Sequence, residues 1–585
     1  MLRSGPAPAP HHSNISNPWQ GLDSIVVETD WSRHRDFTVV IDAGSSGSRV
    51  LVYSWISTDQ VRQTTPDAHM LSGLPIIEKG DEEGEQWQFK EAPGISSYAA
   101  HPHRLADHIQ PLLTAALRVV PSSKVAQTPI YLFATAGMRL LPPKQQGMLL
   151  DRACQYTKAH AKFYIAACSR HFQVIPGAAE GIYGWMAVNY QLNGFAKTGD
   201  RRLYDRPSEA ELAQPPTASG HKHTFGFLDM GGASTQIAFE PTPAMAREHA
   251  DDLTMLTLRN LDGHDVTYKV FTTTFLGFGS NQARIRHEQE MLNAWHYAGG
   301  SGATDQPPRV VTEEIHNPYP AAKSVQTITL EDPCLHPGLS LPVHPELVHD
   351  SAHRSVILKG QGSFADCARR AVNLLNKALP CPTDPCLFNG VHSPAIDFDL
   401  QQFVGISEYW YSSQDIFQLG GVWDFTTFER RASQFCSTPW DQIQREFGAK
   451  HTAERLQMQC FKAAWLATVL HDGVGLPRTT PSPTPAPPGQ AEFNVTEELA
   501  HIQQEGRAHG INVPFQSVNT VNDFEVSWTL GAALIHAVSR IPARTPGWAI
   551  ISFVLIMGLV GGLALLVKHI SQNPYIRRRW SKKRL

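Results

Sequence analysis

The stretch FTVVIDAGSSGSRVLVY, residues 37–53, consists of an apolar strand, a short glycine-rich turn and a second apolar strand. Residues 37–41 are β-branched or apolar, which favours a buried strand, and Asp42 stands at the end of that strand. Glycines in the turn tolerate positive φ and let another group approach the backbone closely. Successive N–H groups in such a turn form a concave nest that suits a phosphate. The stretch therefore predicts a β-hairpin with a phosphate-binding turn at its tip.

A second stretch, TFGFLDMGGASTQIAF at residues 224–239, repeats this pattern. An apolar strand again ends in an aspartate, Asp229, and Gly231, Gly232 and a Ser-Thr pair follow. Carboxylate oxygens are the ligands that Ca²⁺ and Mg²⁺ prefer. Two such hairpins in one chain predict two phosphate loops that face each other, with a metal ion held between Asp42 and Asp229.

Length, composition and charge limit the classes of protein to consider. A chain of 585 residues is long enough for two or more domains, each with its own core. A hydrophobic content of 42% with 18% charged residues is typical of a folded protein. The formal net charge of −4 gives no reason to expect nucleic acid as a partner. The chain contains no GxxxxGK[ST] motif, so its own signature excludes a P-loop enzyme.

The eight cysteines show no CxxC pair, which fits disulfides better than zinc ligands. Eight cysteines allow 105 pairings, so the sequence does not derive the connectivity. Cys381 and Cys386 are candidates for a local bridge, and buried free thiols are the alternative. Glycosylation sequons at Asn14 and Asn494 agree with an oxidising compartment.

The C-terminal region contains an apolar run of 20 residues without a charge, at 548–567. A run of this length can cross a bilayer and predicts a transmembrane helix. The basic tail 568–585 then lies in the cytosol by the positive-inside rule, with the body in the lumen. Residues 1–35 are polar and contain no apolar signal-peptide core. A cytosolic body therefore stays open as the second topology, although the cysteines and sequons favour the lumen.

Five short stretches resemble, in order, the five apyrase-conserved regions of the nucleoside triphosphate diphosphohydrolases, or apyrases. An ordered set of five is far more specific than a single glycine loop, and the resemblance spans residues 37–539. The segment SEYWYSSQDIFQLGG, 407–421, together with the apolar C-terminal run, looks most like the Golgi or endosomal–lysosomal branch, which includes the fungal Golgi apyrase. The five stretches are IDAGSSGSR from Ile41, ATAGMR from Ala134, GAAEGIYGW from Gly177, LDMGGASTQ from Leu228 and GGVWDF from Gly420.

The resemblance implies an α/β fold of two ribonuclease-H-like lobes, as in actin, sugar kinases and heat-shock ATPases, with a nucleotide cleft between them. One C-terminal transmembrane helix would complete the chain. The expected domains are a disordered N-terminus at 1–35, lobe I at 36–178 completed by 505–540, lobe II at 179–504 with a Pro-rich loop at 477–490, the transmembrane helix at 548–567 and the basic tail at 568–585.

The resemblance also implies how the substrate is held. Asp42 and Asp229 would position a Ca²⁺ or Mg²⁺ ion through its waters, because Mg²⁺ gives up its waters reluctantly. Tyr409 and Trp410 would stack on the base. The phosphates would contact the two turns, at Gly44, Ser45, Ser46, Gly47 and Ser48 in the first and Gly231, Gly232 and Ala233 in the second.

For catalysis, Glu180 matches the general base of the family, and Ser234 and Gln236 match the residues that hold the attacking water. Thr135 would support the terminal phosphate. Water is a poor nucleophile until a base takes its proton, hence a glutamate within hydrogen-bond reach. Ala179 stands where the family often has an acidic residue, and the loss of that like charge would lower the pKa of Glu180.

The expected activity is that of a membrane-anchored, metal-dependent hydrolase of nucleoside tri- and diphosphates. In the Golgi, such an enzyme would convert the nucleoside diphosphates released by glycosyltransferases to monophosphates. A selective GDPase or UDPase is one alternative, and a kinase or exopolyphosphatase on the same fold is another. A non-hydrolysing nucleotide-binding module of the actin or chaperone type is the alternative outside the enzymes. Ser45 and Ser46 are interpreted as phosphate ligands, because no adjacent histidine is present to activate them as nucleophiles.

Overall fold

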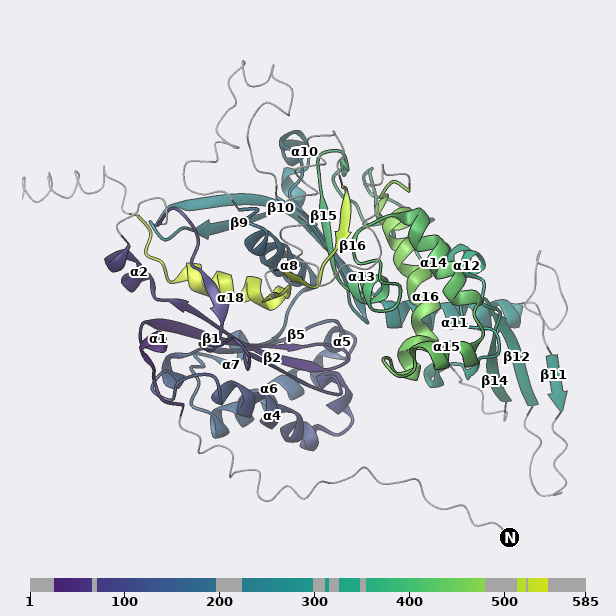
Figure 1. The fold of residues 1–585 in the computed structure, drawn as a ribbon, viewed down its shortest axis with the longest axis horizontal. Coiled ribbons are helices and arrows are strands. Elements are labelled where there is room, and N and C mark those ends of the chain that lie inside the picture. Colours follow the sequence, from purple (N-terminus) through teal and green to yellow (C-terminus); the bar gives the residue numbers. More distant parts are fainter. Residues whose placement is uncertain are drawn as a thin grey trace, which may run out of the picture.

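The first predicted hairpin is confirmed as β1 (Arg35–Ala43) and β2 (Ser48–Ile56), which pair antiparallel with Asp42 opposite Arg49. The computed structural model describes residues 26–65, 71–195, 224–297, 311–314, 326–347, 354–478, 513–521 and 524–544. Two β-sheets dominate the fold (Figure 1). We call the body built on each sheet lobe I and lobe II.

Lobe I contains a six-stranded sheet in the order β3-β2-β1-β5-β6, with β4 also paired to β2. The central strand β1 is apolar and almost wholly buried, as expected of a strand covered on both faces. It pairs parallel with β5, and β5 pairs parallel with β6. The remaining strands and the helices of this lobe are β3 (Ile77–Lys79), β4 (Gln88–Glu91), β5 (Ile130–Ala134), β6 (Phe172–Val174), α1 (Asp30–Arg33), α2 (Thr58–Thr64), α4 (Leu105–Leu117), α5 (Ala136–Arg139), α6 (Pro143–His160) and α7 (Cys168–His171).

Lobe II repeats this topology in a seven-stranded sheet, β16-β17-β15-β7-β8-β10-β9. The order β10-β8-β7-β15-β17 corresponds to β3-β2-β1-β5-β6, with the same parallel and antiparallel pairings. The two-lobe α/β fold expected from the sequence is therefore confirmed. The strands are β7 (Gly226–Met230), β8 (Ser234–Phe239), β9 (Thr254–Arg259), β10 (Asp265–Leu276), β15 (Phe403–Ser407), β16 (Gly421–Val422) and β17 (Phe515–Ser517).

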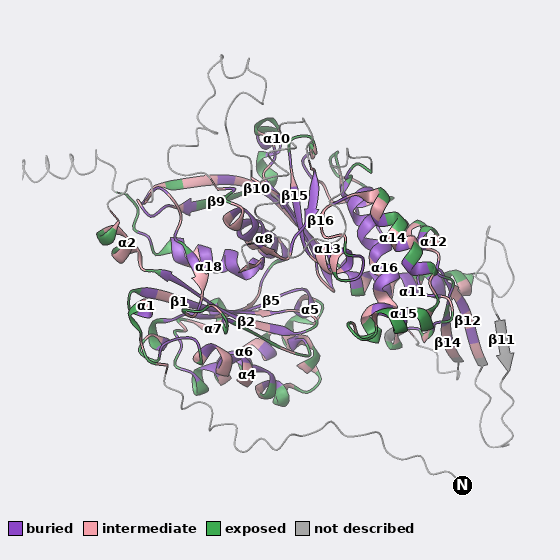
Figure 2. Ribbon diagram, in the orientation of Figure 1, coloured by how far each residue is buried: buried purple, intermediate pink, exposed green. Residues whose placement is uncertain are grey.

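Two buried helices, α8 (Gly177–Gln191) and α18 (Trp528–Ser539), lie between the sheets and pack against each other (Figures 1 and 2). Each follows the last parallel strand of its lobe. A Cβ on Gly531 of α18 would overlap the backbone carbonyl of Tyr183 in α8, so only glycine allows this approach. Tyr53 of β2 donates to or accepts from Thr529 of α18 at 2.7 Å. The lobes thus share one hydrophobic core, which the two helices join.

Lobe II is enlarged by a helical layer and by a second, smaller sheet, and this sheet was not predicted from the sequence. These lie at the end of the molecule away from lobe I (Figure 1). The small sheet has the order β11-β12-β14-β13. Its elements and the added helices are β11 (Val311–Glu314), β12 (Gln326–Asp332), β13 (Ser340–Pro342), β14 (Arg354–Gly360), α10 (Pro243–Glu248), α11 (Ser280–Tyr297), α12 (Phe364–Asn373), α13 (Glu408–Trp410), α14 (Phe425–Ser437), α15 (Trp440–Phe447) and α16 (Ala453–Thr468), and a two-stranded ribbon of β18 (Thr520–Val521) and β19 (Phe524–Glu525) precedes α18.

All eight cysteines form disulfides, which confirms the interpretation of their spacing. The candidate local bridge is present. The pairs are Cys154–Cys168 in lobe I, and Cys334–Cys367, Cys381–Cys386 and Cys436–Cys460 in lobe II.

The expected transmembrane helix requires a correction to the fold class. Among the described residues, no helix is both long enough and apolar enough to cross a bilayer. The most C-terminal of them, α18, has 12 residues, about 18 Å against a hydrocarbon core of about 30 Å. The 18-residue helices α6 and α11 contain several charged side chains. Residues 548–567 themselves lie outside the described residues, as do both sequons, the tail 568–585 and the Pro-rich loop from residue 479 onward.

Two of the predicted segments, 1–35 and 505–540, can be compared with the structure where their residues are described. Residues 26–35, expected to be disordered, contain α1 and the first residue of β1. In the stretch 505–540, expected to complete lobe I, β17 pairs with β15 in the lobe II sheet and α18 packs against both lobes. The domain boundaries themselves stay a prediction.

Candidate active site

The two glycine-rich turns face each other across the junction of the lobes. In each turn one peptide N–H closes the loop: Gly44 donates to the Gly47 carbonyl and Gly231 to the Ser234 carbonyl, both at 3.0 Å. A Cβ on Gly232 would lie 3.1 Å from the Ser45 hydroxyl of the opposite turn. Both turns come at the carboxyl ends of central strands, where ligands bind in α/β sheets.

Three carboxyl groups converge at these turns, on Asp42, Asp229 and Glu180. Burial raises the pKa of Asp42 to about 7 and that of Asp229 to about 6. Burial also raises the pKa of Glu180 to about 8, against the opposing effect of Arg139, and the negative charges of both aspartates add to the rise. Burial therefore outweighs the lowering of the pKa expected from Ala179. Such coupling requires that the three groups lie close together.

The aspartates fit a divalent cation. One carboxylate oxygen of each, Oδ1 of Asp42 and Oδ1 of Asp229, is buried without a hydrogen-bond partner among the described residues. Buried polar atoms are nearly always satisfied, so two such oxygens at one place indicate a missing partner. An oxygen-seeking cation such as Ca²⁺ or Mg²⁺ would satisfy both and lower the pKa of each carboxyl group.

Glu180 belongs to one hydrogen-bonded set with the two predicted water-holding residues. The Gln236 amide donates to Glu180 Oε2 at 3.3 Å and to the Ser234 hydroxyl at 2.6 Å. The Arg139 guanidinium donates to the same Oε2 at 2.5 Å. Glu180 and Gln236 are buried, so this geometry is fixed by the protein and not by solvent.

Local sequence explains why these side chains meet. Glu180 lies in the first turn of α8, directly after β6. A Cβ on Gly177 would overlap the Arg139 guanidinium, so glycine is required where Arg139 reaches Glu180. Gln236 stands opposite Asp229 in the β7–β8 register, which points both residues to the same face of the sheet.

Several predicted residues lie at the site without a polar contact that defines their role. Ser45 and Gly47 belong to the first turn, and Ser46 is its exposed residue. Ala233 is buried in the second turn. Thr135 is buried directly before α5, and its N–H donates to the Ala43 carbonyl at 3.2 Å, beside the end of β1.

The side chains of two predicted ligand residues are buried and directed elsewhere. The Ser48 side chain is fully buried and bonds to the His108 ring at 2.7 Å, inside lobe I. Tyr409 has no exposed surface and its ring packs edge-on against Phe515, so it offers no face for stacking. Composition does not reveal the direction of these two side chains. Trp410 is partly exposed and one edge of its ring lies beside Gly420, so its stacking on the base stays a prediction.

Three residues of the site were missed. Arg139 is part of the quoted ATAGMR stretch, and a cation next to a small-residue turn was the available signal. Ser407 hydrogen-bonds Asp229 and lowers its pKa, and it has a positive φ of 58° at the end of β15. Asn281 lies beside Gly232, 2.9 Å from where a Cβ would stand. Nothing in the local sequence distinguishes the last two.

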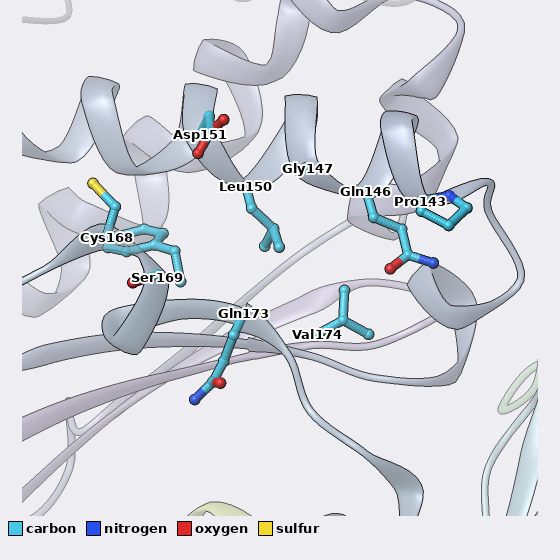
Figure 3. Close-up of a pocket in the computed structure, with 10 residues that line it drawn as sticks. Pro143, Gln146, Gly147, Leu150, Asp151, Cys168, Ser169, Gln173 and Val174 are labelled. Carbon is cyan, nitrogen blue, oxygen red and sulfur yellow. The ribbon is translucent and has the colours of Figure 1, made fainter.

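A cavity of about 390 Å³ lies elsewhere, on lobe I between α6, α7 and β6. Leu150 and Gln146 of α6 point toward the side of the cavity that carries Val174 of β6 (Figure 3). None of the predicted site residues lines this cavity, so it does not enter the interpretation of the site.

Comparison with known proteins identifies the family. A model of the GDA1/CD39 (nucleoside phosphatase) family matches residues 29–546. This chain belongs to that family. Within the nucleoside phosphatases, the Golgi apyrase of Saccharomyces cerevisiae is 36% identical over 518 residues, covering 87% of this chain and 71% of the yeast protein. The Golgi apyrase of Schizosaccharomyces pombe is 33% identical and covers 88% and 77%.

A solved structure agrees with the fold of this nucleoside phosphatase. Nucleoside triphosphate hydrolases from Neospora caninum match it with a TM-score of 0.51 at 14% identity, over 87% of this chain and 94% of the other. Identity at this level supports the two-lobe fold alone. The match with the family establishes that the chain is a phosphatase of nucleotides.

Proposed function

We propose that this nucleoside phosphatase removes the terminal phosphate of nucleoside tri- and diphosphates, and that Glu180 activates the attacking water. The observation that carries the proposal is the hydrogen-bonded set of Glu180, Gln236 and Ser234. It lies beside two aspartates, between two turns that face each other. Phosphoryl transfer needs positioning and charge neutralisation more than covalent help, and this arrangement supplies both.

The phosphates would lie between the two turns, where peptide N–H groups and the hydroxyls of Ser45 and Ser46 can donate to phosphate oxygens. Asp42 and Asp229 would hold a Ca²⁺ or Mg²⁺ ion, whose positive charge offsets the charge of the phosphate oxygens.

Glu180 has one oxygen suited to take the proton. Among the described residues, both of its hydrogen bonds, from Arg139 and Gln236, fall on Oε2. Oε1 is therefore the oxygen that accepts the proton of the water, while Gln236 and Ser234 orient that water. The water oxygen bonds to the terminal phosphorus, and the bond from phosphorus to the bridging oxygen breaks. The products are inorganic phosphate and a nucleotide shorter by one phosphate.

A place in the Golgi is part of the proposal. It is supported by the two fungal relatives named Golgi apyrase. There the enzyme would convert nucleoside diphosphates released by glycosyltransferases to monophosphates.

The experiment is phosphate release from ATP, ADP, GDP and UDP by wild type and Glu180→Gln, with and without EDTA. General-base help is typically worth about 10²–10⁴-fold, so the variant should lose about that factor on every nucleotide that the wild type hydrolyses. Glu429→Gln, an exposed glutamate on α14, is the matched control and should keep full activity. Near-normal turnover by Glu180→Gln would reject the base assignment. Tight ATP binding without hydrolysis by the wild type would instead support the non-hydrolysing module.

A further inference from the structure

Two imidazoles and a carboxylate meet in lobe II, outside the site described above. Among the described residues, two groups bring three potential metal-ligand atoms within 4.8 Å of one another. One group contains Cys334, whose sulfur is bonded to Cys367 and so cannot bind a metal. The other consists of His249, Asp252 and His392.

This cluster lies at the end of the lobe II sheet opposite the carboxylates. β8 begins at Ser234 in the candidate active site and ends at Phe239, and α10 leads from there to His249. His392 likewise lies before the first residue of β15, and the last residue of that strand is Ser407, which hydrogen-bonds Asp229 in the candidate active site. The six residues of β8 span about 20 Å at 3.3 Å per residue. A ligand at the cluster is therefore separate from one held by Asp42 and Asp229.

The three donor atoms form a triangle of suitable size for one metal ion. His249 Nδ1 and His392 Nε2 are 3.2 Å apart. Asp252 Oδ2 lies 3.4 Å from His392 Nε2 and 3.7 Å from His249 Nδ1. Tetrahedral zinc with bonds of about 2.0–2.1 Å separates its ligand atoms by about 3.3 Å. The triangle of the three donor atoms therefore matches one face of such a tetrahedron.

The Nδ1 atom of His392 is engaged outside the cluster. Nδ1 lies 2.6 Å from the Thr383 carbonyl and 3.0 Å from the Pro385 carbonyl. Carbonyls only accept hydrogen bonds, so Nδ1 carries a hydrogen and Nε2 is the ring atom that is directed to the cluster and can bind a metal. Metal-binding histidines commonly make this second contact, which orients the ring.

The segment that carries His392 is tied to the protein at several points. It follows the Cys381–Cys386 disulfide, and the backbone of Cys386 pairs with that of His392. The ring of Phe388, four residues earlier, stacks on Phe275 in the core with centroids 3.8 Å apart. On the other side, His249 is buried at the end of α10, where its backbone N–H donates to the Met245 carbonyl at 2.9 Å. Packing and backbone hydrogen bonds thus position both imidazoles before any ligand binds.

We propose that His249, Asp252 and His392 bind a zinc ion, which ties the α10–β9 connection to the segment that follows the Cys381–Cys386 disulfide. Two imidazoles and one carboxylate suit zinc, whereas Ca²⁺ and Mg²⁺ prefer oxygen ligands only. Three protein ligands leave the fourth position of zinc for water. The site goes beyond the proposed hydrolysis, and it stands whether or not that proposal holds. Without a metal, the two imidazoles share an N–H···N hydrogen bond beside the Asp252 carboxylate, and the Zn²⁺ titration distinguishes this arrangement from a metal site.

The experiment is a Zn²⁺ titration of the EDTA-stripped full chain against a chromophoric chelator. Excess Ca²⁺ is present, so that the aspartates of the active site are supplied with the cation they prefer. The wild type should bind one equivalent of Zn²⁺, and His392→Ala and Asp252→Asn should bind it at least tenfold more weakly. His103→Ala, an exposed histidine of lobe I, is the matched control and should bind as the wild type does.

Thermal unfolding gives a readout independent of activity. Zn²⁺ should raise the Tm of the wild type and of His103→Ala but not that of the two ligand variants, since a ligand stabilises only the form that binds it. The Asp252 side chain is 45% exposed, so Asp252→Asn should fold even where His392→Ala does not. Absence of Zn²⁺ binding by the wild type would overturn the proposal, and so would binding of equal strength by wild type and Asp252→Asn.

Discussion

Arg139 is the residue on which the position of Glu180 depends most directly. Its guanidinium donates to Oε2, leaves Oε1 for the water, and limits the rise in the pKa of Glu180 that burial causes. Gly177 provides the space that the guanidinium needs. A single cation thus acts on both the geometry and the pKa of the proposed base.

Replacing this arginine should therefore change the pH profile as well as the rate. In Arg139→Ala we expect kcat to fall by about 10–10²-fold, and the rise of activity with pH to shift upward, because the pKa of Glu180 is no longer held down. Arg139→Lys keeps the positive charge but lacks the planar guanidinium. Its kcat and its pH profile should therefore lie between those of the wild type and those of Arg139→Ala. The measurement is kcat from about pH 5.5 to 9. A uniform loss with an unchanged profile would contradict the electrostatic role.

His108 allows a test of pH-dependent stability away from the site. It is fully buried on α4, bonds to Ser48, and burial lowers its pKa to about 4. In the unfolded chain the His108 ring binds a proton near pH 6.5, whereas in the folded chain it stays neutral down to about pH 4. The free energy of unfolding therefore decreases as the pH falls from about 6.5 towards 4.

The test compares wild type with His108→Gln, whose amide can still bond to Ser48. The advantage of wild type over the variant in free energy of unfolding should shrink by roughly 1–2 kcal/mol between about pH 7.5 and 5. Urea unfolding at both pH values measures it. An advantage of equal size at both values would show that the ring titrates alike in both states.

At the scale of elements, the first turn is fixed by glycines of neighbouring segments. A Cβ on Gly94 would overlap the Ser45 carbonyl, and one on Gly137 would lie 2.8 Å from the Ser45 Cα. The φ of Gly94 is −58°, which any residue adopts, so space alone requires glycine there. The atoms that such a Cβ would meet belong to the backbone of the first turn, so they cannot move aside as the end of a flexible side chain can.

Gly94→Ala should consequently displace the phosphate-binding turn. We expect a loss of about 1–3 kcal/mol in stability and an increase in KM for nucleotides. Gly147→Ala is the matched control, because Gly147 lies within α6 with nothing within 4 Å of its Cβ position. Alanine should there stabilise the protein by about 1 kcal/mol through helix propensity. Urea unfolding and nucleotide kinetics of both variants test the pair, and equal effects would contradict the steric argument.

The elements differ in how far the sequence predicts them. Both hairpins follow from apolar strands that end in Asp and glycine. The small sheet was missed because β11 has only four residues and adjoins Gly- and Pro-rich sequence that indicates a loop. Tyr409 and Ser48 were assigned to the ligand because strand and turn patterns do not say which way a side chain points. The pair His249 and His392, 143 residues apart, is brought together only by the fold.

At the scale of the whole molecule, the lobes are two copies of one topology that share a core. Tyr53 of lobe I and Phe227 of lobe II belong to the same buried cluster as Trp185 of α8 and Leu534 of α18. Packing of this kind makes separate unfolding of the lobes unfavourable, because either lobe alone would expose apolar surface.

Calorimetry should accordingly show one unfolding transition for both lobes. Gly531→Ala, which forces α18 away from Tyr183, should lower the Tm of that single transition and reduce activity, because the packing that aligns the two turns is disturbed. Gly147→Ala again serves as the control. Two resolved transitions in the wild type would show that the lobes are independent.

The disulfides have a consequence for motion. Each of the four bridges joins residues of the same lobe, Cys154–Cys168 in the first and the other three in the second. Oxidation therefore stiffens each half of the molecule internally and places no covalent restraint on the angle between the halves. The angle is set instead by the non-covalent packing of α8 against α18, so a change in that angle would break no covalent bond between the halves.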